Sequence, residues 1–372
     1  MKPAPAAWQQ AGSILAVRLD TFGDVLMTTP ALAALAGGGD RQVTLLASEA
    51  GAAVARYVPP LADVITYRAP WVSQVEHGGS SDHALLSAWA KRRFDAAIIF
   101  TVCTQSALAA ALMCRMAGIP LRLAHSRENP YELLTNWAPE SDVCRPGMRH
   151  EVQRQLDLVA SVGFGSADDK LVFACRPEDR ETARVKLTLA GGRVGRPTIV
   201  VHPGSSAPSR RYPAERFGAA AQRLAVACGA QIVFVGGDGD IDACAAAQRT
   251  MVLPSVSLAG RLSLGELGAL IADARLLVCN NSGPSHLAAA VGTPVVVLYA
   301  LTNPQHTPWR VPCRVLSREV PCRDCLKSVC PAGHHACLLG VEPKDVADVA
   351  LELWHEAEAG PSRDTRRALH AA

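Results

Sequence analysis

The sequence predicts an α/β protein that is built from two doubly wound parallel sheets. Short apolar runs alternate with helical stretches along the chain, which is the order of a parallel sheet with crossover helices. The 372 residues are too many for one ordinary domain and enough for two. Hydrophobic residues make up 49% of the chain and aromatic residues only 5%, so the cores must consist of Ala, Val and Leu, which let helices lie close on sheets.

The first domain is expected to span residues 1–175, with a loose Ala- and Pro-rich start at 1–11. Its strands are predicted at short apolar runs, over residues 13–18, 42–47, 63–67, 96–101 and 121–125. Its helices are predicted between and after these runs, over residues 24–36, 50–56, 84–93, 106–117 and 150–162. Residues 68–82 and 126–148 lack a period and are predicted as long loops, which in a compact domain are usually functional.

A linker is expected over residues 176–196, where a charged helix at 177–189 precedes the sequence AGGRVGRP. The second domain then spans residues 197–342, followed by a final helix at 343–358 and a disordered tail at 359–372. Strands are predicted in this domain over residues 198–202, 230–235, 256–258, 276–279 and 295–299. Helices are predicted over residues 214–228, 241–249, 263–274 and 285–291.

The stretch 276–299, LLVCNNSGPSHLAAAVGTPVVVLY, reads as strand, tight turn, helix, turn and strand. Ser282 or Ser285 can cap the helix, Gly283 lets the backbone approach a ligand, and Pro284 suits a first helical turn. A helix N-terminus that follows a parallel strand offers free N–H groups and the positive end of the helix dipole, which together suit phosphate. The alternative is an ordinary strand–helix junction.

Three loops of the second domain follow predicted strands, at 203–213, 236–240 and 280–286. Ligands of doubly wound sheets bind at the carboxyl ends of the strands, so we expect these loops to converge on one ligand. The loop at 18–24 is expected to face them across a cleft between the domains.

Two of these loops contain polar residues suited to a nucleotide. In PGSSAPSRRYP at 203–213, hydroxyl groups and the paired Arg210 and Arg211 fit a diphosphate, although a solvated polar loop is the alternative. GGDGD at 236–240 fails the dinucleotide fingerprint because its third position is Asp242 rather than Gly or Ala. Asp238 or Asp240 could still bind ribose hydroxyls, or simply cap a helix.

The loop at 18–24 offers two carboxylates, Asp20 and Asp24, on either side of Gly23. Asp24 is expected at the start of a helix, where Gly23 can turn it toward a substrate and the helix dipole lowers its pKa. We expect Asp24 to act as a general base, while a plain N-cap is the alternative. Asp20 lies early in the loop, where the sequence does not constrain its direction.

Four of the twelve cysteines cluster near the end of the second domain, at Cys322, Cys325, Cys330 and Cys337. Clustered thiols in an intracellular chain favour a structural metal, Zn²⁺ or iron, over a disulfide. Buried reduced thiols and a labile disulfide are the alternatives.

The formal net charge of +3 argues against a dedicated nucleic-acid-binding protein. No apolar run approaches the ~20 residues that span a bilayer, and the N-terminal apolar run at 14–17 is too short for a signal peptide. We therefore expect a cytoplasmic protein.

The order and spacing of several motifs resemble glycosyltransferase family 9, the ADP-heptose:lipopolysaccharide heptosyltransferases. The motifs are R-x4-GD-x3-TTPAL at 18–32, RHEVQRQLDLVASVGF at 149–164, HPG…RRYP at 202–213, NNSGPSH at 280–286 and PCRDCLKSVCPAGHHACL at 321–338. The resemblance implies a GT-B fold, two Rossmann-like domains with the final helix crossing back to the first. It also implies inverting transfer of heptose from ADP-heptose without a catalytic metal.

The resemblance assigns roles to particular residues. Asp24 falls on the catalytic base of the family, and Arg210 falls on its phosphate-binding Lys. The remaining donor-side positions fall on Ser205, Ser206, Asp238, Asn281, Ser282, Gly283 and His286. The chain departs from the family at Asn281, where an Asp is usual, so that position keeps hydrogen bonding and loses a negative charge.

The acceptor implied by the resemblance is lipopolysaccharide core or another glycan, with peripheral contact at the inner membrane face. The basic loop at 115–149, with Arg122, Arg127 and Arg145, is a candidate for the anionic groups of the acceptor, or else a solvated surface. Two other functions stay open, a nucleotide-sugar epimerase of the same fold and a catalytically weakened sugar-nucleotide-binding relative. The epimerase would release its product without any acceptor. The weakened relative is suggested by Asn281, which stands where the family usually has an Asp.

Overall fold

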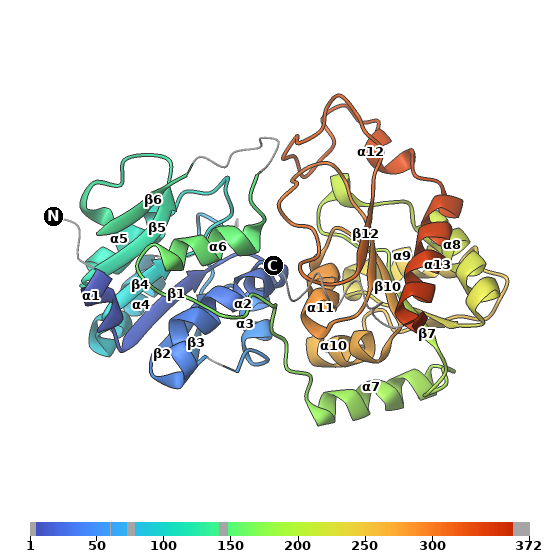
Figure 1. Cartoon of the computed structure of the whole chain (residues 1–372), viewed down its shortest axis with the longest axis horizontal. Helices are drawn as coiled ribbons and strands as arrows, with labels where there is room; N and C mark the ends of the chain where they lie inside the picture. Colours follow the sequence, from blue (N-terminus) through green and yellow to red (C-terminus); the bar gives the residue numbers. More distant parts are fainter. Residues whose placement is uncertain (1–4, 60, 73–78, 141–147, 360–372) are drawn as a thin grey trace. The chain divides into compact units, whose positions relative to one another are not determined.

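The computed structural model describes residues 5–59, 61–72, 79–140 and 148–359. The chain forms two compact units, residues 1–174 and 175–372, and the described part of each contains one six-stranded sheet (Figure 1). All neighbouring strands in both sheets are parallel. The predicted fold class, two doubly wound α/β sheets, is therefore confirmed.

The first sheet has the strand order β3-β2-β1-β4-β5-β6. Its strands are β1 (Ser13–Arg18), β2 (Gln42–Ala47), β3 (Asp63–Thr66), β4 (Ala96–Ile99), β5 (Leu121–Ser126) and β6 (Asn136–Pro139). The order reverses between β1 and β4, which are the central strands. The carboxyl ends of these two strands mark the switch point where ligands of such sheets bind.

Helices cover both faces of the first sheet. They are α2 (Phe22–Ala36), α3 (Glu49–Ala55), α4 (Gly79–Arg92), α5 (Leu108–Met116) and α6 (Glu151–Ala160). Helix α2 contacts both α3 and α6, whereas residues of α4 and α5 share a separate core cluster with Leu15 and Val17 of β1. Alternate residues of a strand point to opposite faces, so the continuous apolar run of β1 supplies both cores.

The second sheet has the strand order β12-β11-β10-β7-β8-β9. Its strands are β7 (Thr198–His202), β8 (Gln231–Phe234), β9 (Val256–Ser257), β10 (Leu276–Asn280), β11 (Val295–Leu298) and β12 (Cys313–Leu316). Counted from its own first strand, this sheet repeats the order of the first and is also Rossmann-like. Its switch point lies between β7 and β10.

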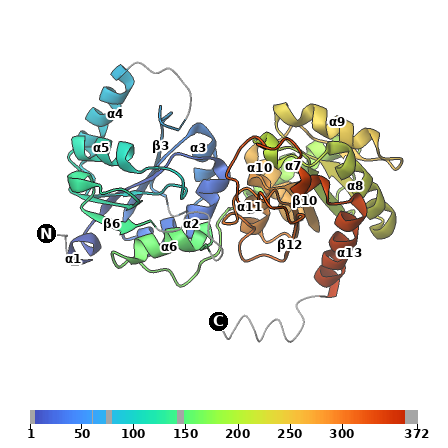
Figure 2. The same ribbon diagram turned by 90° about the horizontal axis from the view of Figure 1, so that it is seen from above.

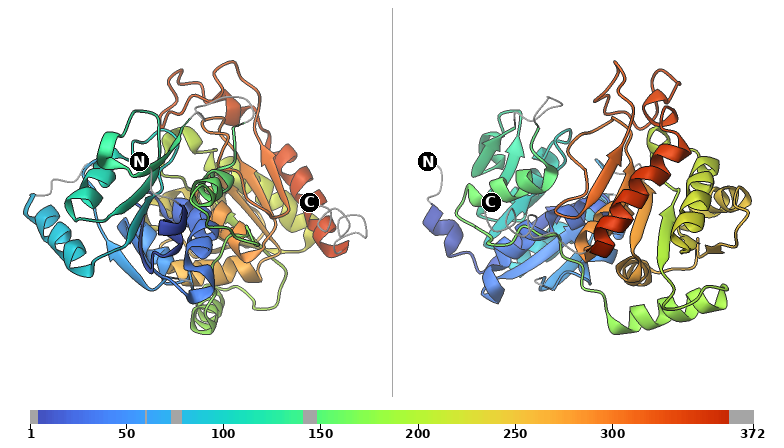
Figure 3. Two further views of the ribbon diagram at one scale, coloured as in Figure 1. Left: turned by 60° about the vertical axis from the view of Figure 1, so that its left-hand side comes forward. Right: turned by 45° about the vertical axis from the view of Figure 1, so that its right-hand side comes forward.

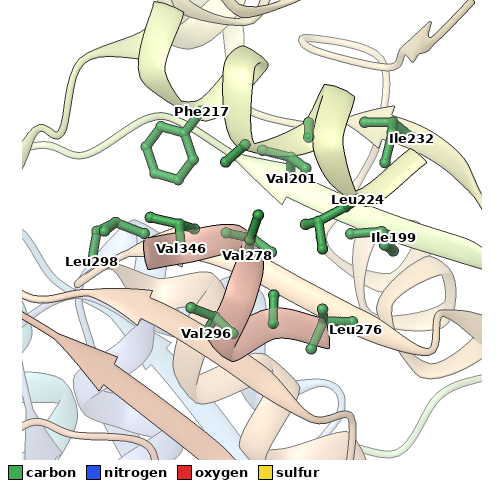
Figure 4. Packing of buried hydrophobic residues seen from close by; sticks show 14 of the residues in the cluster. Ile199, Val201, Phe217, Leu224, Ile232, Leu276, Val278, Val296, Leu298 and Val346 are labelled. Atoms are coloured by element: carbon green, nitrogen blue, oxygen red, sulfur yellow. The ribbon is translucent and has the colours of Figure 1, made fainter. Parts of the chain in front are cut away.

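The helices of the second unit are α7 (Pro177–Leu189), α8 (Ala214–Cys228), α9 (Ile241–Arg249), α10 (Leu264–Asp273), α11 (Gly283–Val291), α12 (Ala336–Leu339) and α13 (Pro343–Ala359). Helix α8 contacts α9 and α13, and α10 contacts α7 and α11, so the two groups cover opposite faces of the sheet (Figures 1 and 2). Figure 4 shows the core beneath α8 and α13, where these labelled residues meet: Ile199, Val201, Phe217, Leu224, Ile232, Leu276, Val278, Val296, Leu298 and Val346.

The final helix, which the resemblance predicts to cross back to the first domain, packs in the core of the second unit. Five residues of α13 lie in the same buried cluster as α8 and the sheet, namely Val346, Ala347, Ala350, Leu353 and Trp354. Helix α13 runs alongside the sheet in Figure 3. The predicted tail falls almost entirely on residues 360–372, outside the described residues. None of the helices in the described part of the chain is both long and apolar enough to cross a membrane.

The structure contains elements that the sequence pattern did not predict. Strand β6 lies within the stretch 126–148 that was expected to be a loop, and β12 forms the far edge of the second sheet. Both are short edge strands with largely half-buried side chains, so neither has the fully apolar run of a central strand. The stretch 1–11, which was expected to be loose, contains the short helix α1 (Pro5–Gln9). Its buried Trp8 donates the indole N–H to the Asn136 side chain at 3.0 Å.

Candidate functional site

The loops after β7, β8 and β10 meet at the carboxyl edge of the second sheet through His202, the last residue of β7. The imidazole Nδ1 of His202 lies 3.4 Å from the Ser282 hydroxyl, and its Nε2 lies 3.6 Å from Asp240 Oδ2. His202 is the strongest influence on Asp240 and lowers the pKa of that carboxyl. The loops that were expected to converge are therefore adjacent in the structure.

Asn280 fixes the path of the 203–212 loop. Its side-chain amide donates to the Pro203 carbonyl at 2.7 Å and accepts the Tyr212 N–H at 3.0 Å, and the side chain is fully buried. The loop also approaches Asp240 closely, since a Cβ at Gly204 would lie 2.1 Å from Asp240 Oδ1. The phosphate-type loop is thus held by Asn280 at the end of β10, a role that the sequence did not reveal.

The two adjacent arginines of the RRYP motif have different surroundings. Arg211 donates from Nε to the Ser205 carbonyl at 2.7 Å and is engaged in holding the loop. Arg210 has a buried Nε that makes no hydrogen bond with any part of the chain that the structure describes. Arg210 is therefore the arginine with unused donor capacity.

The NNSGPSH motif forms the end of β10 and the start of α11. Ser282 is the N-cap of α11, Gly283 is its first residue, and His286 is buried in its first turn. Asn281 is also buried, and its amide Nδ2 makes no hydrogen bond of good geometry to any described residue. The α11 N-terminus lies next to the Arg210 loop, since Ser282 contacts His202 and Asn280 contacts Pro203.

The predicted serines and Asp238 are less tightly placed. Ser205 is buried and Ser206 is exposed, and the carbonyl of each faces Arg211. Asp238 is exposed, in the loop after β8 and over the backbone of Gly260. Of the two acidic residues in this loop, the buried contacts belong to Asp240 rather than to Asp238.

The carboxyl edge of the first sheet contains a buried cluster of charges around Arg18, the last residue of β1. Each guanidinium nitrogen contacts a different carboxylate, with Nε 3.1 Å from Asp20, Nη2 3.3 Å from Asp24 and Nη1 3.2 Å from Glu151. Burial opposes the charge of Arg18, but the three carboxylates outweigh it and raise the pKa of the guanidinium. Neither Arg18 nor Glu151 was predicted to belong to the site, although a charged residue that ends an apolar strand is a signal that could have been used.

Asp24 is neither the N-cap of its helix nor a residue aimed by a flexible glycine. Helix α2 begins at Phe22, Gly23 lies inside it, and Asp24 is its third residue. The Asp24 Oδ2 accepts the backbone N–H of Thr21 at 3.0 Å and the Thr21 hydroxyl at 2.7 Å, which forms a capping box. Asp24 is therefore oriented by Thr21 on one side and Arg18 on the other.

Asp20 has a defined direction, contrary to the expectation from sequence. Its carboxylate accepts from Gln105 at 2.6 Å and contacts Arg18, and the Ser48 hydroxyl donates to its backbone carbonyl. Burial raises the pKa of Asp20 to about 6, and the Arg18 charge only partly opposes this. The edge therefore presents two carboxylates that share Arg18, and each has a further partner of its own, Gln105 for Asp20 and Thr21 for Asp24.

Comparison with known proteins identifies the family. The family model for glycosyltransferase family 9 (heptosyltransferase) matches residues 83–336, which is more than half of the chain. The chain belongs to glycosyltransferase family 9. It is 32% identical over 162 residues to lipopolysaccharide heptosyltransferase 3 of Escherichia coli, a match that covers 43% of this chain and 46% of that protein. It is 30% identical over 170 residues to lipopolysaccharide heptosyltransferase 2 of the same species, covering 44% and 49%.

The matched stretch spans about half the length of these family 9 relatives, whereas solved structures match over nearly the whole chain. A family 9 glycosyl transferase from Veillonella parvula has a TM-score of 0.75 at 23% identity, covering 92% of this chain and 97% of that one. The E. coli ADP-heptose lipopolysaccharide heptosyltransferase II has a TM-score of 0.72 at 22% identity, covering 93% and 99%. At these identities the likeness shows the fold, and the GT-B class implied by the resemblance is confirmed.

A more distant structural neighbour of this family 9 chain has an iron-containing structure. It is the iron-containing dodecameric glycosyltransferase TibC from E. coli, with a TM-score of 0.52 at 13% identity, covering 93% of this chain and 77% of that one. Here Cys322, Cys325, Cys330 and Cys337 are all free thiols, and Cys322 Sγ lies 3.8 Å from His334 Nε2. Among the described residues, no group of three His, Cys, Asp or Glu side chains is arranged to hold a metal ion, so the metal site stays a prediction.

Of the three arginines proposed to meet an anionic acceptor, Arg122 is excluded by its contacts. It is buried and donates to the backbone carbonyls of Ile119, Glu132 and Leu133, so it holds the turn before β6. Arg127 is exposed and donates to the Thr104 carbonyl, and Arg145 lies outside the described residues.

A cavity of about 510 Å³ in the second unit lies away from the candidate site. It is lined by residues near the starts of β10 and β11, including Arg275 and Pro294, at the opposite ends of the strands from Asn281. Ligands of doubly wound sheets bind at the carboxyl ends, so the cavity is not the expected donor site.

Proposed function

We propose that this chain transfers a heptosyl group from ADP-heptose to a lipopolysaccharide core acceptor, with inversion at the anomeric carbon. The observation that supports this most strongly is Arg210, whose buried and unpartnered Nε lies in the loop beside the N-terminus of α11. A guanidinium and a helix N-terminus at one switch point suit a diphosphate. Family 9 membership and the names of the curated relatives support the choice of heptose.

The second unit binds the donor in this proposal. Arg210, the hydroxyls of Ser205 and Ser206, and the N–H of Gly283 contact the diphosphate. Asp238 contacts the adenosine side, and Asn281, Ser282 and His286 complete the donor site. The same positive groups stabilise the charge that develops on the diphosphate when the glycosidic bond breaks.

The first unit supplies the base. Asp24 removes the proton from an acceptor hydroxyl as that oxygen forms a bond to the anomeric carbon. The bond from this carbon to the diphosphate breaks at the same time, and ADP leaves with the electron pair. Arg18 keeps Asp24 in place, because the two opposite charges are 3.3 Å apart. General base assistance of this kind is worth about 10²–10⁴ in rate.

The acceptor and the metal complete the proposal. The acceptor is lipopolysaccharide core, and the protein works in the cytoplasm with peripheral contact at the inner membrane face, as membership of family 9 suggests. The four clustered cysteines hold a structural Zn²⁺ or iron ion, which the chemistry of the thiols and the iron of TibC support. The metal orders the loop after β12 and takes no part in the transfer.

The function is tested by incubating the purified chain with ADP-heptose, with and without heptose-deficient lipopolysaccharide. We expect ADP to form only when the acceptor is present, together with an acceptor heavier by one heptose in mass spectrometry. Nuclear magnetic resonance of the new anomeric centre should show inversion.

The same experiment separates the two other functions. A changed or released sugar nucleotide without an acceptor would indicate an epimerase. Tight binding of ADP-heptose without turnover under either condition would indicate a binding relative, as the Asn281 substitution suggests.

A further inference from the structure

Four side-chain atoms near the carboxyl ends of β10 and β11 are buried and make no hydrogen bond of good geometry within the described part of the chain. They are Arg210 Nε, Asn281 Nδ2, Thr302 Oγ1 and Asp324 Oδ1. Buried polar atoms are nearly always paired, because leaving one unpaired costs free energy. Several such atoms in one place indicate a polar ligand group.

Tyr299, the residue after β11, relates three of these groups to one another. Burial raises the pKa of the Tyr299 hydroxyl, which donates to the Asn303 carbonyl. Arg210 and the Asn281 amide lower this pKa and Asp324 raises it further, so all three side chains lie near the same hydroxyl. The cluster therefore combines the loops after β7, β10 and β11 with the segment after β12.

Backbone hydrogen bonds hold the segment 324–328 against these loops. The Asp324 N–H donates to the Leu301 carbonyl at 2.7 Å, and the Leu326 N–H donates to the Thr302 carbonyl at 2.9 Å. The same segment also contacts the loop after β7. Ser209 donates from its N–H to the Ser328 carbonyl and from its hydroxyl to the Lys327 carbonyl. Because Ser209 precedes Arg210, Asp324 and Thr302 are fixed beside the proposed diphosphate arginine.

The donors and acceptors in this cluster match a sugar better than a second phosphate. Asn281 offers an N–H donor, Thr302 offers a hydroxyl that both donates and accepts, and Asp324 offers a carboxylate acceptor. Neighbouring sugar hydroxyls need acceptors as well as donors, whereas a phosphate would be repelled by the Asp324 charge. The glycosyl group of a nucleotide sugar is bonded directly to its diphosphate, which places it next to Arg210.

We propose that Thr302 and Asp324, together with Asn281, bind hydroxyl groups of the glycosyl part of the nucleotide-sugar donor. The inference rests on the proposed function and adds two residues from the loops after β11 and β12. These residues select the sugar and do not take part in the bond exchange. In this proposal the Asp324 carboxylate accepts hydrogen bonds from sugar hydroxyls, and the neighbouring Asn281 amide donates to them.

The test compares the affinities of ADP and ADP-heptose by calorimetry in three variants of the full chain. Asp324→Asn removes the charge and suits the backbone, because Asn tolerates the positive φ of 57° at this position. We expect this variant to bind ADP-heptose about tenfold more weakly, as the loss of a charged hydrogen bond implies, and to bind ADP as the wild type does.

Thr302→Val removes only the hydroxyl and should weaken ADP-heptose binding by about threefold or more. Since that hydroxyl makes no hydrogen bond to the described chain, the melting temperature should not fall. The matched control is Glu319→Gln, which removes an exposed carboxylate that contacts Arg323, as Asp324 also does. This control should bind both ligands as the wild type does.

The outcomes separate this inference from the proposed function. If the wild type binds neither ligand, the proposed function is wrong and the inference fails with it. If the wild type binds both and the two variants keep its preference for ADP-heptose over ADP, only the inference fails. Equal weakening of both ligands with a lower melting temperature would show that Asp324 only stabilises its segment, which also overturns the inference.

Discussion

Arg18 Nη2 lies 3.3 Å from Asp24 Oδ1, so the last residue of β1 contacts the carboxylate that α2 presents in its first turn. The Asp24 carboxylate is at the same time the acceptor of the Thr21 capping box. One oxygen of this carboxylate faces Thr21 and the other faces Arg18, so the capping contact is compatible with the proposed role of Asp24 as a base.

Asp24→Asn should reduce kcat by about 10²–10⁴ while ADP binding is unchanged, because the amide cannot accept a proton. The variant should also lose about 1–3 kcal/mol of unfolding free energy, since an amide in place of the carboxylate no longer pairs with Arg18. Steady-state kinetics and thermal unfolding measure the two effects. Full turnover in Asp24→Asn with loss of turnover in Asp20→Asn would make Asp20 the base instead.

Arg210→Ala should weaken ADP binding by about 1.5–3 kcal/mol, the usual contribution of a hydrogen bond to a charged group. Arg211→Ala should change ADP affinity less and instead lower the melting temperature, because Arg211 is bonded to the Ser205 carbonyl. Calorimetry with ADP distinguishes the two variants. Unchanged ADP affinity in Arg210→Ala would remove this residue from the donor site.

Asp20 should make the stability of the protein depend on pH. Its pKa is about 6 in the folded chain and 3.8 in the reference state, so the folded chain holds the proton more tightly. The contribution of Asp20 to stability is therefore complete below pH 3.8 and is lost as the pH rises through about 6. The unfolding free energy of the wild type relative to Asp20→Asn should fall by up to about 3 kcal/mol over this range, at about 1.4 kcal/mol per pKa unit. A constant difference from pH 4 to 7 would contradict the raised pKa.

Glu151→Gln should destabilise the first unit by about 3 kcal/mol, because it removes one carboxylate from a fully buried group of charges. It should also lower the pKa of Asp20, since the negative charge of Glu151 contributes to raising it. Glu178→Gln on the exposed side of α7 is the control and should change neither quantity. Chemical denaturation at several pH values measures both effects, and a Glu151→Gln protein as stable as the control would contradict the role of this charge.

The cysteine cluster should contain about one metal ion per chain when the protein is purified without chelator. Elemental analysis should show that Cys322→Ser reduces this content, whereas Cys175→Ser, at an isolated thiol, does not. Metal-free protein with unchanged melting temperature and activity would exclude a structural metal.

The sequence predicted the central elements well, since their signals are local. Strands 13–18, 42–47 and 198–202 and helices 177–189, 214–228 and 241–249 have the expected bounds. Apolar runs and helix-terminating residues determine these elements. The edge strands β6 and β12 were missed because they are short and only half-buried.

The candidate sites could be predicted only where a motif lies within one loop. The sequence indicated Arg210, but only the structure shows that Arg211 is engaged with Ser205 while Arg210 Nε is unpartnered. Asp20 accepts from Gln105 on a distant segment, and Arg18 contacts Glu151 on α6. Contacts over such sequence separations leave no periodic signal in the chain.

The central position of β1 has a consequence for synthesis on the ribosome. β1 is made first, yet its second neighbour, β4, begins at Ala96, with Ile14 opposite Ala96 in the register. Translation proceeds at about 5–20 residues per second, so the edge of β1 that pairs with β4 stays unpaired for roughly 4–16 s after β1 is made. Such an edge can pair with other nascent chains, so we expect the yield of soluble protein to depend on translation speed and on chaperones that bind early.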